Sequence, residues 1–549
     1  MAIRSTVPPF LQHRSVQLAV VIGATALLLL PMLWIGFIND DVAYISLFFR
    51  DNAPDPLRLL TSTGITEDYY RPLSELSSAV DFWLWGWNPV GFRLTNLLLH
   101  LLATGLVFRL AERWFGGPFV PFAAALFFGL LPVHETSILW IPGRTDLLCA
   151  VFYLGSVCSL TTYARSNKWR DQCLALLLML LALLSKEMAF SLPLILIPVV
   201  WWVDRQQGVR WQPKRTFRIV APFFLLAAGV VAARWLLLDN NMLFGGNGPH
   251  TDTNILHLAR NMAMFLAALV IPTGLYQLQG LLMAYPTAVA GGGTIVAGAA
   301  AWAAWRNRGR LLPLLLPAAW VLLSLLPVSR LMMRWYLYIP SVGFSIGLAW
   351  AIGQLAPHRW RLRAALAGGV ALLYAVVLLL ATAQWVSASR IADSLVAQLR
   401  QDLRGSSGTD TIHVASLLAR IQTVPVFHLG FQKTLQRALG NDSLVVGTWG
   451  RFVADRYPSR ISYRYDSAQG SIHLSADDGG YFLLGGNALQ VNNGQMAAQV
   501  ETDAGSGTVT IDRVSESGQP SAITVPIPSR ERHRSIIFDG SRFVVVEGL

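Results

Sequence analysis

Long apolar runs and short polar tracts alternate over the first 383 residues. Most runs have about 18–22 residues, the length that a helix needs to cross roughly 30 Å of hydrocarbon. We predict crossings at residues 16–38, 94–111, 119–140, 147–163, 174–184, a segment that ends at 202, 219–238, 311–327, 336–351 and 364–383. Residues 256–305 hold two apolar blocks, and we expect one crossing there, with 256–275 interfacial or re-entrant. The pattern predicts a polytopic α-helical membrane protein with about 11 transmembrane helices.

Basic residues set the expected orientation of these helices. They gather in short tracts between the apolar runs, at residues 165–170, 205–218, 306–310 and 359–363. Short loops rich in Lys and Arg face the cytoplasm, so the N-terminus is predicted to lie inside. The polar stretch 39–92 and the C-terminus are then predicted to lie outside. The first run has no small-residue cleavage site at its end, which favours a retained helix over a signal peptide.

The chain changes character after about residue 387. No later segment is apolar and long enough to span a membrane. Residues 391–439 have helical periodicity, whereas 444–549 show short alternating runs such as ISYRYD, GSIHLS, YFLLGG and RFVVVEG between turn residues. We therefore predict two domains: a transmembrane domain at 1–387, with its first outer loop at about 39–92, and a soluble α+β, β-rich domain at 388–549.

Composition agrees with a membrane protein and argues against a nucleic-acid-binding one. Hydrophobic residues make up 54% of the chain and charged residues only 13%, whereas ordinary soluble domains carry about 25% charged residues. The net charge of +12 is concentrated in the basic loops, so no nucleic-acid partner is expected. Cys149, Cys158 and Cys173 lie in or beside apolar segments without metal-binding spacing, and we interpret them as small core residues.

Polar residues cluster at one end of the predicted helices. These residues are Asp40, Asp41, His134, Glu135, Arg144, Asp146, Lys186, Glu187, Arg330 and Arg334. On the expected topology all of them lie on the outer side. Ionisable groups at membrane depth are costly and usually mark a functional cavity. The pattern therefore predicts one charged outer chamber beside the lipid, which suits a phosphorylated lipid substrate and acid/base chemistry.

The acidic and cationic residues of this chamber each allow more than one role. Asp40 and Asp41 can accept a proton, bind a metal or cap a helix. Arg71 suits phosphate, with a salt bridge to Asp68 or Asp81 as the alternative. Lys186 can bind an anionic headgroup or pair with its neighbour Glu187.

The histidines and the aromatic residues also allow more than one role. His134 can bind phosphate when protonated or hold a carboxylate, and Glu135 can pair with Arg144. Asn96 and His100 share one face of a helix, where a satisfied core histidine is the plainer reading. The aromatic run from Trp335 to Tyr338 follows Arg334, which is typical of a membrane interface.

Four sequence blocks carry a family resemblance. They read YYRPLSELSSAVDFWLWGWNPVGFRLTNLLLH, PVHETSILWIPGRTDLLCAVFYL, LALLSKEMAFSLPL and MRWYLYIPSVGF. In this order, over about residues 30–350, they resemble the membrane part of the transmembrane-and-TPR-containing O-mannosyltransferases and their bacterial relatives. Those proteins are GT-C glycosyltransferases. The resemblance implies a GT-C-like fold and transfer of a sugar from a polyprenyl-phosphate carrier to an acceptor on the outer face.

The resemblance also implies roles for single residues. The catalytic base of such enzymes is usually an acidic residue of the first outer loop, which here is Asp40 or Asp41. The family's blocks map to Arg71, to His134 with Glu135, to Lys186 with Glu187, and to Arg334 through Ser341. Together with the polar pattern, this gives Arg71, His134, Arg144, Lys186, Arg330 and Arg334 as the expected phosphate-binding residues. Supporting residues are expected among Glu67, Asp68, Tyr70, Asn96, His100, Glu135, Asp146, Glu187, Tyr336 and Tyr338. No metal or other cofactor is expected, because cations can hold a monophosphate leaving group.

Two departures from the family limit what can be carried over. Met333 stands where the family has a Glu in its late block, and the C-terminal part lacks TPR repeats. We predict an inverting glycosyltransferase in a bacterial inner membrane, with a periplasmic C-terminal domain. Its expected partners are a polyprenyl-phosphate-linked sugar, membrane lipid and a protein or glycan acceptor. The alternatives are an oligosaccharide ligase or polymerase and a lipid-linked sugar flippase.

Overall fold

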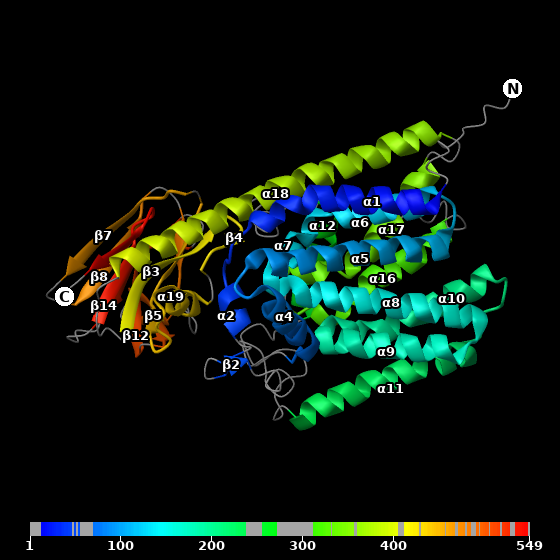
Figure 1. Cartoon of the computed structure of the whole chain (residues 1–549), viewed down its shortest axis with the longest axis horizontal. Helices are drawn as coiled ribbons and strands as arrows, with labels where there is room; N and C mark the ends of the chain where they lie inside the picture. Colours follow the sequence, from blue (N-terminus) through cyan, green and yellow to red (C-terminus); the bar gives the residue numbers. More distant parts are fainter. Residues whose placement is uncertain are drawn as a thin grey trace. The chain divides into compact units, whose positions relative to one another are not determined.

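The structure is a computed structural model of the whole chain. It describes residues 13–546 except for 47–48, 51–52, 55–69, 238–254, 272–310, 331, 356–358, 404–410, 428–429, 456, 467–469, 478–479, 485–489, 493–494, 504, 516–518 and 527–532. Internal contacts divide the chain into two units (Figure 1). The transmembrane unit comprises Met1–Leu33 and Phe48–Ala383, and the C-terminal unit comprises Trp34–Leu47 and Gln384–Leu549.

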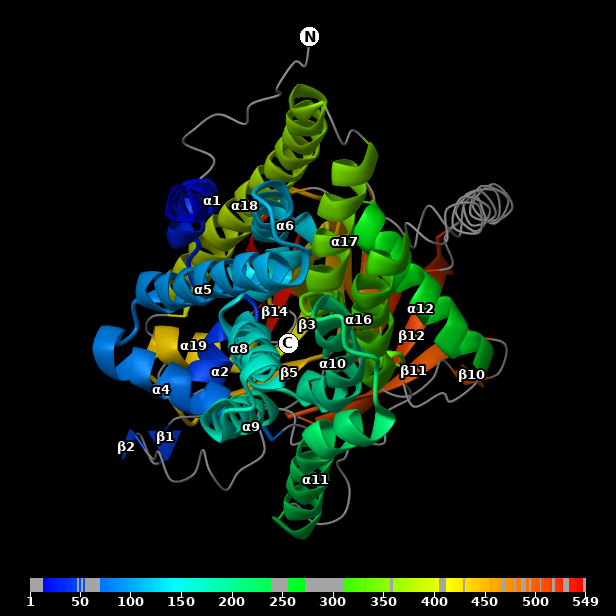
Figure 2. The ribbon, with the colours of Figure 1, turned by 90° about the vertical axis from the view of Figure 1, so that its right-hand side faces the viewer.

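Helices build the transmembrane unit. Its α-helices are α1 (Arg14–Leu29), α4 (Pro72–Trp85), α5 (Pro89–Phe115), α6 (Phe119–Leu130), α7 (Glu135–Leu139), α8 (Arg144–Ser166), α9 (Trp169–Ser185), α10 (Leu192–Gln206), α11 (Pro213–Leu237), α12 (Ile255–Val270), α16 (Leu315–Leu325) and α17 (Pro340–Leu355). Short strands β1 (Phe49–Arg50) and β2 (Ala53–Pro54) pair with each other. Helix α8 packs against α5, α9 and α10, and α6 packs against α5 and α17 (Figure 2).

The helix lengths identify a multi-pass membrane protein. Six helical segments of the described chain are long and apolar enough to cross a bilayer: Arg14–Trp34, Pro89–Phe115, Ile141–Ser166, Glu187–Gln206, Pro213–Leu236 and Trp360–Asp402. A bent pair, Phe119–Leu130 with Pro132–Leu139, would make a seventh. The expected total of about 11 crossings stays a prediction. The expected re-entrant stretch is described only in its first part, by α12.

Short 3₁₀ helices interrupt the bundle where the charged residues lie. They are η3 (Pro132–His134), η4 (Ile141–Gly143), η5 (Glu187–Ser191), η6 (Leu312–Leu314), η7 (Leu326–Val328) and η8 (Arg334–Leu337), while η2 (Leu30–Trp34) follows α1. The predicted crossing at 119–140 consists of two helical parts with a break between them. Leu131 is extended, with ψ of 118°, because it precedes Pro132, and the chain bends there by 45°.

The C-terminal unit contains two sheets. An antiparallel sheet has the order β10-β11-β12-β13-β8-β7, and a mixed sheet has the order β15-β14-β3-β6-β9, with β4 and β5 beside β3. Their bounds are β3 (Thr411–Ile421), β4 (Val424–Pro425), β5 (Val445–Thr448), β6 (Arg451–Ala454), β7 (Ile461–Asp466), β8 (Ser471–Ala476), β9 (Tyr481–Leu483), β10 (Gln490–Asn492), β11 (Gln495–Thr502), β12 (Gly505–Val514), β13 (Pro520–Pro526), β14 (His533–Phe538) and β15 (Phe543–Val546). The predicted strand-rich C-terminal region is confirmed.

One stretch of this unit differs from its prediction. Residues 391–439 were expected to be helical, and α18 (Trp360–Asp402) and α19 (Phe431–Leu439) are helices, but β3 lies between them. Strand β3 pairs in parallel with β14, β5 and β6 and is buried along most of its length. A strand buried on both faces has a continuous apolar run without alternation, which periodicity does not distinguish from a helix.

The segment that carries Asp40 and Asp41 packs within the C-terminal unit. It contains helix α2 (Asp41–Ser46), and the amide of Asn39 donates a 2.7 Å hydrogen bond to the carbonyl of Val426. Gly430 has φ of +75°, and a Cβ there would lie 2.9 Å from Cα of Asp40. By contacts, the units divide at residue 383 and residues 34–47 join the second unit. The sequence placed the boundary at 387 and the whole of 1–387 in the first domain.

Candidate functional site

Arg71 and Glu187 form a bidentate ion pair at one end of the helices. Arg71 precedes α4, whose first residue is Pro72, and Glu187 begins η5. Nε of Arg71 donates to Oε2 of Glu187 at 3.1 Å, and Nη2 donates to Oε1 at 2.7 Å. Glu187 is therefore a partner of Arg71 in the structure, while Asp81, one of the partners that the sequence offered, pairs with Arg144 and the other, Asp68, lies outside the described residues.

Lys186 occupies the residue between α9 and η5. Its Nζ donates to Oδ1 of Asp146 at 2.7 Å and lies 5.2 Å from the ring centroid of Tyr336 and 6.0 Å from that of Trp335. The backbone of Lys186 is extended, so its side chain and that of Glu187 take different partners. The possible pair between Lys186 and its neighbour does not form. We call Arg71, Asp146, Lys186 and Glu187 the charged cluster.

A second ion pair lies beside the aromatic residues of η8. Arg334 donates to the carboxylate of Glu135, and both side chains are about one-tenth exposed, at 11% and 10%. Nε2 of His134 lies 2.7 Å from the hydroxyl of Ser341. Nδ1 of His100 lies 2.6 Å from the hydroxyl of Tyr338, and its Nε2 lies 3.1 Å from the carbonyl oxygen of Gly129. His100 is fully buried with both ring nitrogens partnered, as a satisfied core histidine is. His134 is fully buried as well, but its Nδ1 has no hydrogen-bond partner among the described residues.

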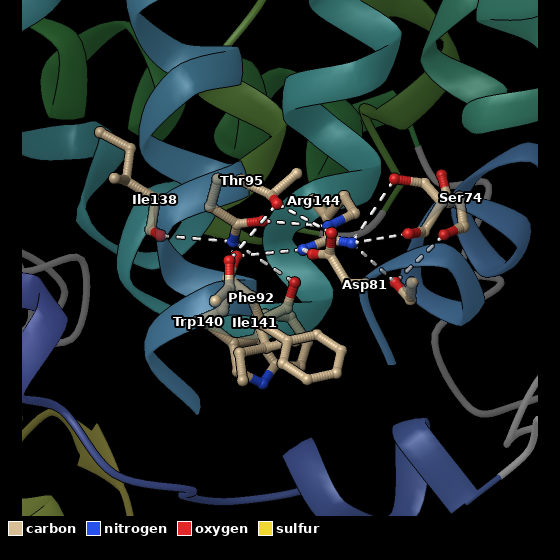
Figure 3. Close-up of polar contacts among 12 residues, drawn as sticks. Ser74, Asp81, Phe92, Thr95, Ile138, Trp140, Ile141 and Arg144 are labelled. Atoms are coloured by element: carbon tan, nitrogen blue, oxygen red, sulfur yellow. Dashed lines mark hydrogen bonds and ion pairs between the residues drawn. The ribbon is translucent and has the colours of Figure 1, made fainter. Parts of the chain in front are cut away.

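Arg144 is surrounded by protein acceptors (Figure 3). Its guanidinium pairs with Asp81 of α4 and donates to Oδ1 of Asn96 at 3.1 Å. It also donates to the carbonyl oxygens of Ser77, at 3.1 Å, and Phe92, at 3.0 Å. The side chain is completely buried. Glu135 was an expected partner, but the pairing is with Asp81. This geometry holds α4, α5 and α8 together and leaves Arg144 poorly placed to bind a ligand.

Asp40 and Asp41 lie in a turn of the C-terminal unit, and both are buried. The amide of Ile38 donates to Oδ2 of Asp41 at 3.1 Å, and Nδ2 of Asn39 donates to Oδ1 of Asp40 at 3.0 Å. Asn39 has φ of +59°, a left-handed conformation that asparagine tolerates better than most residues. The turn therefore holds both carboxylates through hydrogen bonds to nearby groups.

Three further residues were predicted for the site: Glu67, Asp68 and Arg330. Glu67 and Asp68 lie outside the described residues. Arg330 has an exposed side chain, and only its carbonyl oxygen, which accepts from Asn261 at 3.1 Å, has a described contact.

Two residues that the sequence analysis overlooked lie beside Arg71. Arg234 donates to the carbonyl oxygens of Tyr70, at 3.0 Å, and Leu183, at 2.9 Å. It is the single charge near the end of an apolar run, which is the same signal that identified the other cations. Glu75 lies in the first turn of α4 and is only 3% exposed. Burial raises the pKa of Glu75 to about 7, and the nearby Arg71 acts in the opposite direction.

The sequence around Glu75 contains a pattern that could have identified this residue as buried and polar. Ser74, Ser78 and Asp81 share its buried helix face, so α4 turns a polar stripe toward the protein interior.

Within the described ranges, no group of three or more His, Cys, Asp or Glu side chains is arranged to hold a metal ion. The expectation of metal independence stays a prediction.

Comparisons with known proteins support the resemblance read from the four blocks. The chain is 34% identical over 122 residues to protein O-mannosyl-transferase Tmtc1 of Drosophila melanogaster, covering 22% of this chain and 14% of that protein. It is 36% identical over 118 residues to protein O-mannosyl-transferase TMTC2 of Mus musculus, covering 20% and 14%. The chain thus matches about one seventh of the length of these relatives. The resemblance to these transferases is confirmed.

Among solved structures, the chain is similar to ArnT from Cupriavidus metallidurans bound to undecaprenyl phosphate. The TM-score is 0.43 and the sequence identity 16%, over 79% of this chain and 86% of that chain. No protein-family model matches the chain.

Proposed function

We propose that this protein is a membrane glycosyltransferase that moves a sugar from a polyprenyl-phosphate carrier to an acceptor hydroxyl. The observation that carries the proposal is the charged cluster. The side chain of Lys186 is buried, at 2% exposure, and that of Arg71 is partly buried, at 18%, and each is held by a carboxylate at 2.7 Å. Cations kept at membrane depth in fixed positions are a means of binding a phosphate headgroup at the lipid boundary.

The proposed reaction is a single inverting displacement at the anomeric carbon. The acceptor oxygen forms a bond to that carbon while the bond between the carbon and the phosphate oxygen breaks. Asp40 or Asp41 takes the acceptor proton, as the family resemblance implies. The electron pair of the broken bond stays on the polyprenyl phosphate, where Arg71, Lys186 and Arg334 stabilise the developing charge. Arg144 and His134 are assigned to structural roles in this proposal, because protein groups surround both.

The acceptor and the cellular location are part of the proposal. The matched relatives carry the name protein O-mannosyl-transferase, which favours a serine or threonine hydroxyl of a protein over a glycan. The basic tracts favour an outer location for the polar helix ends, and the proposal therefore puts the reaction on the periplasmic face of a bacterial inner membrane. No metal is needed in the proposed step.

Two alternatives make different predictions for the same protein. An oligosaccharide ligase or polymerase would use a lipid diphosphate donor, and a flippase would move the donor across the bilayer without cleaving it. Purified protein in proteoliposomes separates the three when it is given a serine-containing peptide and, in parallel reactions, a radiolabelled polyprenyl-phosphate sugar or a radiolabelled diphosphate donor. Label on the peptide and release of polyprenyl phosphate support the proposal. Label on the peptide only with a diphosphate donor supports a ligase. Transbilayer movement of intact donor supports a flippase.

A further inference from the structure

A cleft of about 450 Å³, lined by both apolar and charged residues, lies within the C-terminal unit. Its walls come from the segment before α2, the last turns of α18, and α19. The residues that define it are Phe37, Asn39, Asp393, Arg400, Phe427 and Arg437. The volume lies within the range of about 300–1,000 Å³ that is typical of ligand pockets. The cleft is therefore large enough for a few residues of an extended chain.

The charges of the cleft are unequal. Two arginines, Arg400 of α18 and Arg437 of α19, face a single carboxylate, Asp393. The guanidinium of Arg437 lies 5.3 Å from the ring centroid of Phe37, and the charge of Asp393 acts on it. Asp393 itself lies against Gly36, where a Cβ would be 2.6 Å from its Oδ2. Arg400 is exposed and makes no hydrogen bond or ion pair with any residue that the structure describes. One positive charge is thus left over for a ligand.

The cleft adjoins the turn that carries Asp40 and Asp41, the residues proposed as the catalytic base. Asn39 lines the cleft and donates its Nδ2 hydrogen to Asp40. Val42, from the first turn of α2, lines it as well. The contact of Gly430 with Asp40 and the bond from Asn39 to Val426 tie this turn to α19 and to the strand region. A ligand in the cleft would therefore touch residues on both sides of Asp40 and Asp41 in the sequence.

We infer that this cleft binds the acceptor as a short acidic peptide segment next to the serine or threonine that receives the sugar. The inference rests on the proposed function and adds the acceptor class to it. Arginine forks match carboxylates, and the apolar surface of Phe37 and Phe427 suits the methylene groups of a peptide. A neutral glycan would leave Arg400 without a counter-charge.

The test is a binding measurement on the full-length protein in detergent, without any sugar donor. The probe is a fluorescein-labelled hexapeptide of alternating Asp and Ser, and alternating Lys and Ser is its matched control. Fluorescence anisotropy should show preference for the acidic peptide. Arg400→Gln and Arg437→Gln should each weaken its binding by about tenfold or more, because each removes a charge-assisted contact.

Matched variants make the result specific. Arg390→Gln on α18 and Lys433→Gln on α19 remove exposed cations that do not line the cleft, and they should bind the acidic peptide as the wild type does. Arg400→Glu should reverse the preference toward the basic peptide. Melting temperatures of all variants check that folding is retained.

Several outcomes would overturn the inference. Equal binding of both peptides, or equal loss in cleft and control variants, would mean that the cleft does not select an acidic segment. Binding to phosphatidylglycerol vesicles that depends on Arg400 and Arg437, with no peptide binding, would assign the cleft to lipid. Peptide binding as expected, combined with no transfer from any sugar donor, would instead contradict the proposed function and leave the cleft assignment standing.

Discussion

Arg71 and Glu187 are 116 positions apart in the chain and form three hydrogen bonds of 2.7–3.1 Å. The pair joins the start of α4 to the turn after α9. Its neighbours, Lys186 and Asp146, repeat the arrangement with a 2.7 Å contact. Removing one partner of a buried ion pair destabilises the folded protein, because the other charge is left uncompensated.

Exchanging the two charges should separate stability from function. Arg71→Gln alone should weaken donor binding, and Glu187→Gln alone should lower the melting temperature by leaving Arg71 without its counter-charge. The double variant Arg71→Glu with Glu187→Arg should recover much of the melting temperature. It should not recover sugar transfer, because the guanidinium no longer projects from the start of α4. Recovery of both properties by the exchange would show that the pair is only structural.

Arg144→Gln should damage folding more than catalysis. Its guanidinium is fully buried and pairs with Asp81, so removal should cost about 3–5 kcal/mol of stability. Thermal unfolding in detergent and the yield of inserted protein measure this effect. A variant that inserts and melts like the wild type but has lost donor affinity would restore Arg144 to the phosphate-binding residues that the sequence predicted.

Glu75 should make stability depend on pH. Its pKa of about 7 lies above the ordinary value of 4.5, so the folded protein holds a proton that the unfolded chain loses first. Its contribution is present below pH 4.5 and is lost as pH rises through 7. Glu75→Gln should therefore be more stable than the wild type at pH 8, by up to about 3 kcal/mol, and little different at pH 5. Parallel stability curves for both proteins from pH 5 to 8 would contradict this assignment.

The two aspartates should affect turnover and spare donor binding. Asp40→Asn or Asp41→Asn should lower transfer by roughly 100-fold or more, the usual effect of losing a general base. Donor binding should persist, because no proposed phosphate ligand is changed. Asp41 also accepts a hydrogen bond from the amide of Ile38, so its variant needs a melting control. If both variants kept full activity, the base would lie elsewhere, and Glu75 would be the next residue to test.

Much of the transmembrane unit follows from the sequence, because helix ends and membrane length are local properties. The positions of the paired residues at helix ends also follow from the sequence; they are Arg71, Glu135, Asp146, Lys186, Glu187 and Arg334. The pairing itself depends on packing between distant helices, so the sequence alone could not identify Glu187 as a partner of Arg71. Asp40 and Asp41 show the same limit. Asp40 lies against Gly430, and its neighbour Asn39 donates to Val426, so that segments almost 400 residues apart come together. Periodicity and composition along the chain do not predict such a long-range contact.

The charged cluster is tested most directly by the affinity for polyprenyl phosphate without a sugar, measured by equilibrium binding. The proteins to compare are the wild type, Arg71→Gln, Lys186→Gln and Arg170→Gln, an exposed arginine near the start of α9. We predict saturable binding that weakens by about tenfold or more in the first two variants, since each loses a charge-assisted phosphate contact, and that is unchanged in the third. Equal affinity in all four proteins, with folding intact, would contradict the assignment of the phosphate site to this cluster.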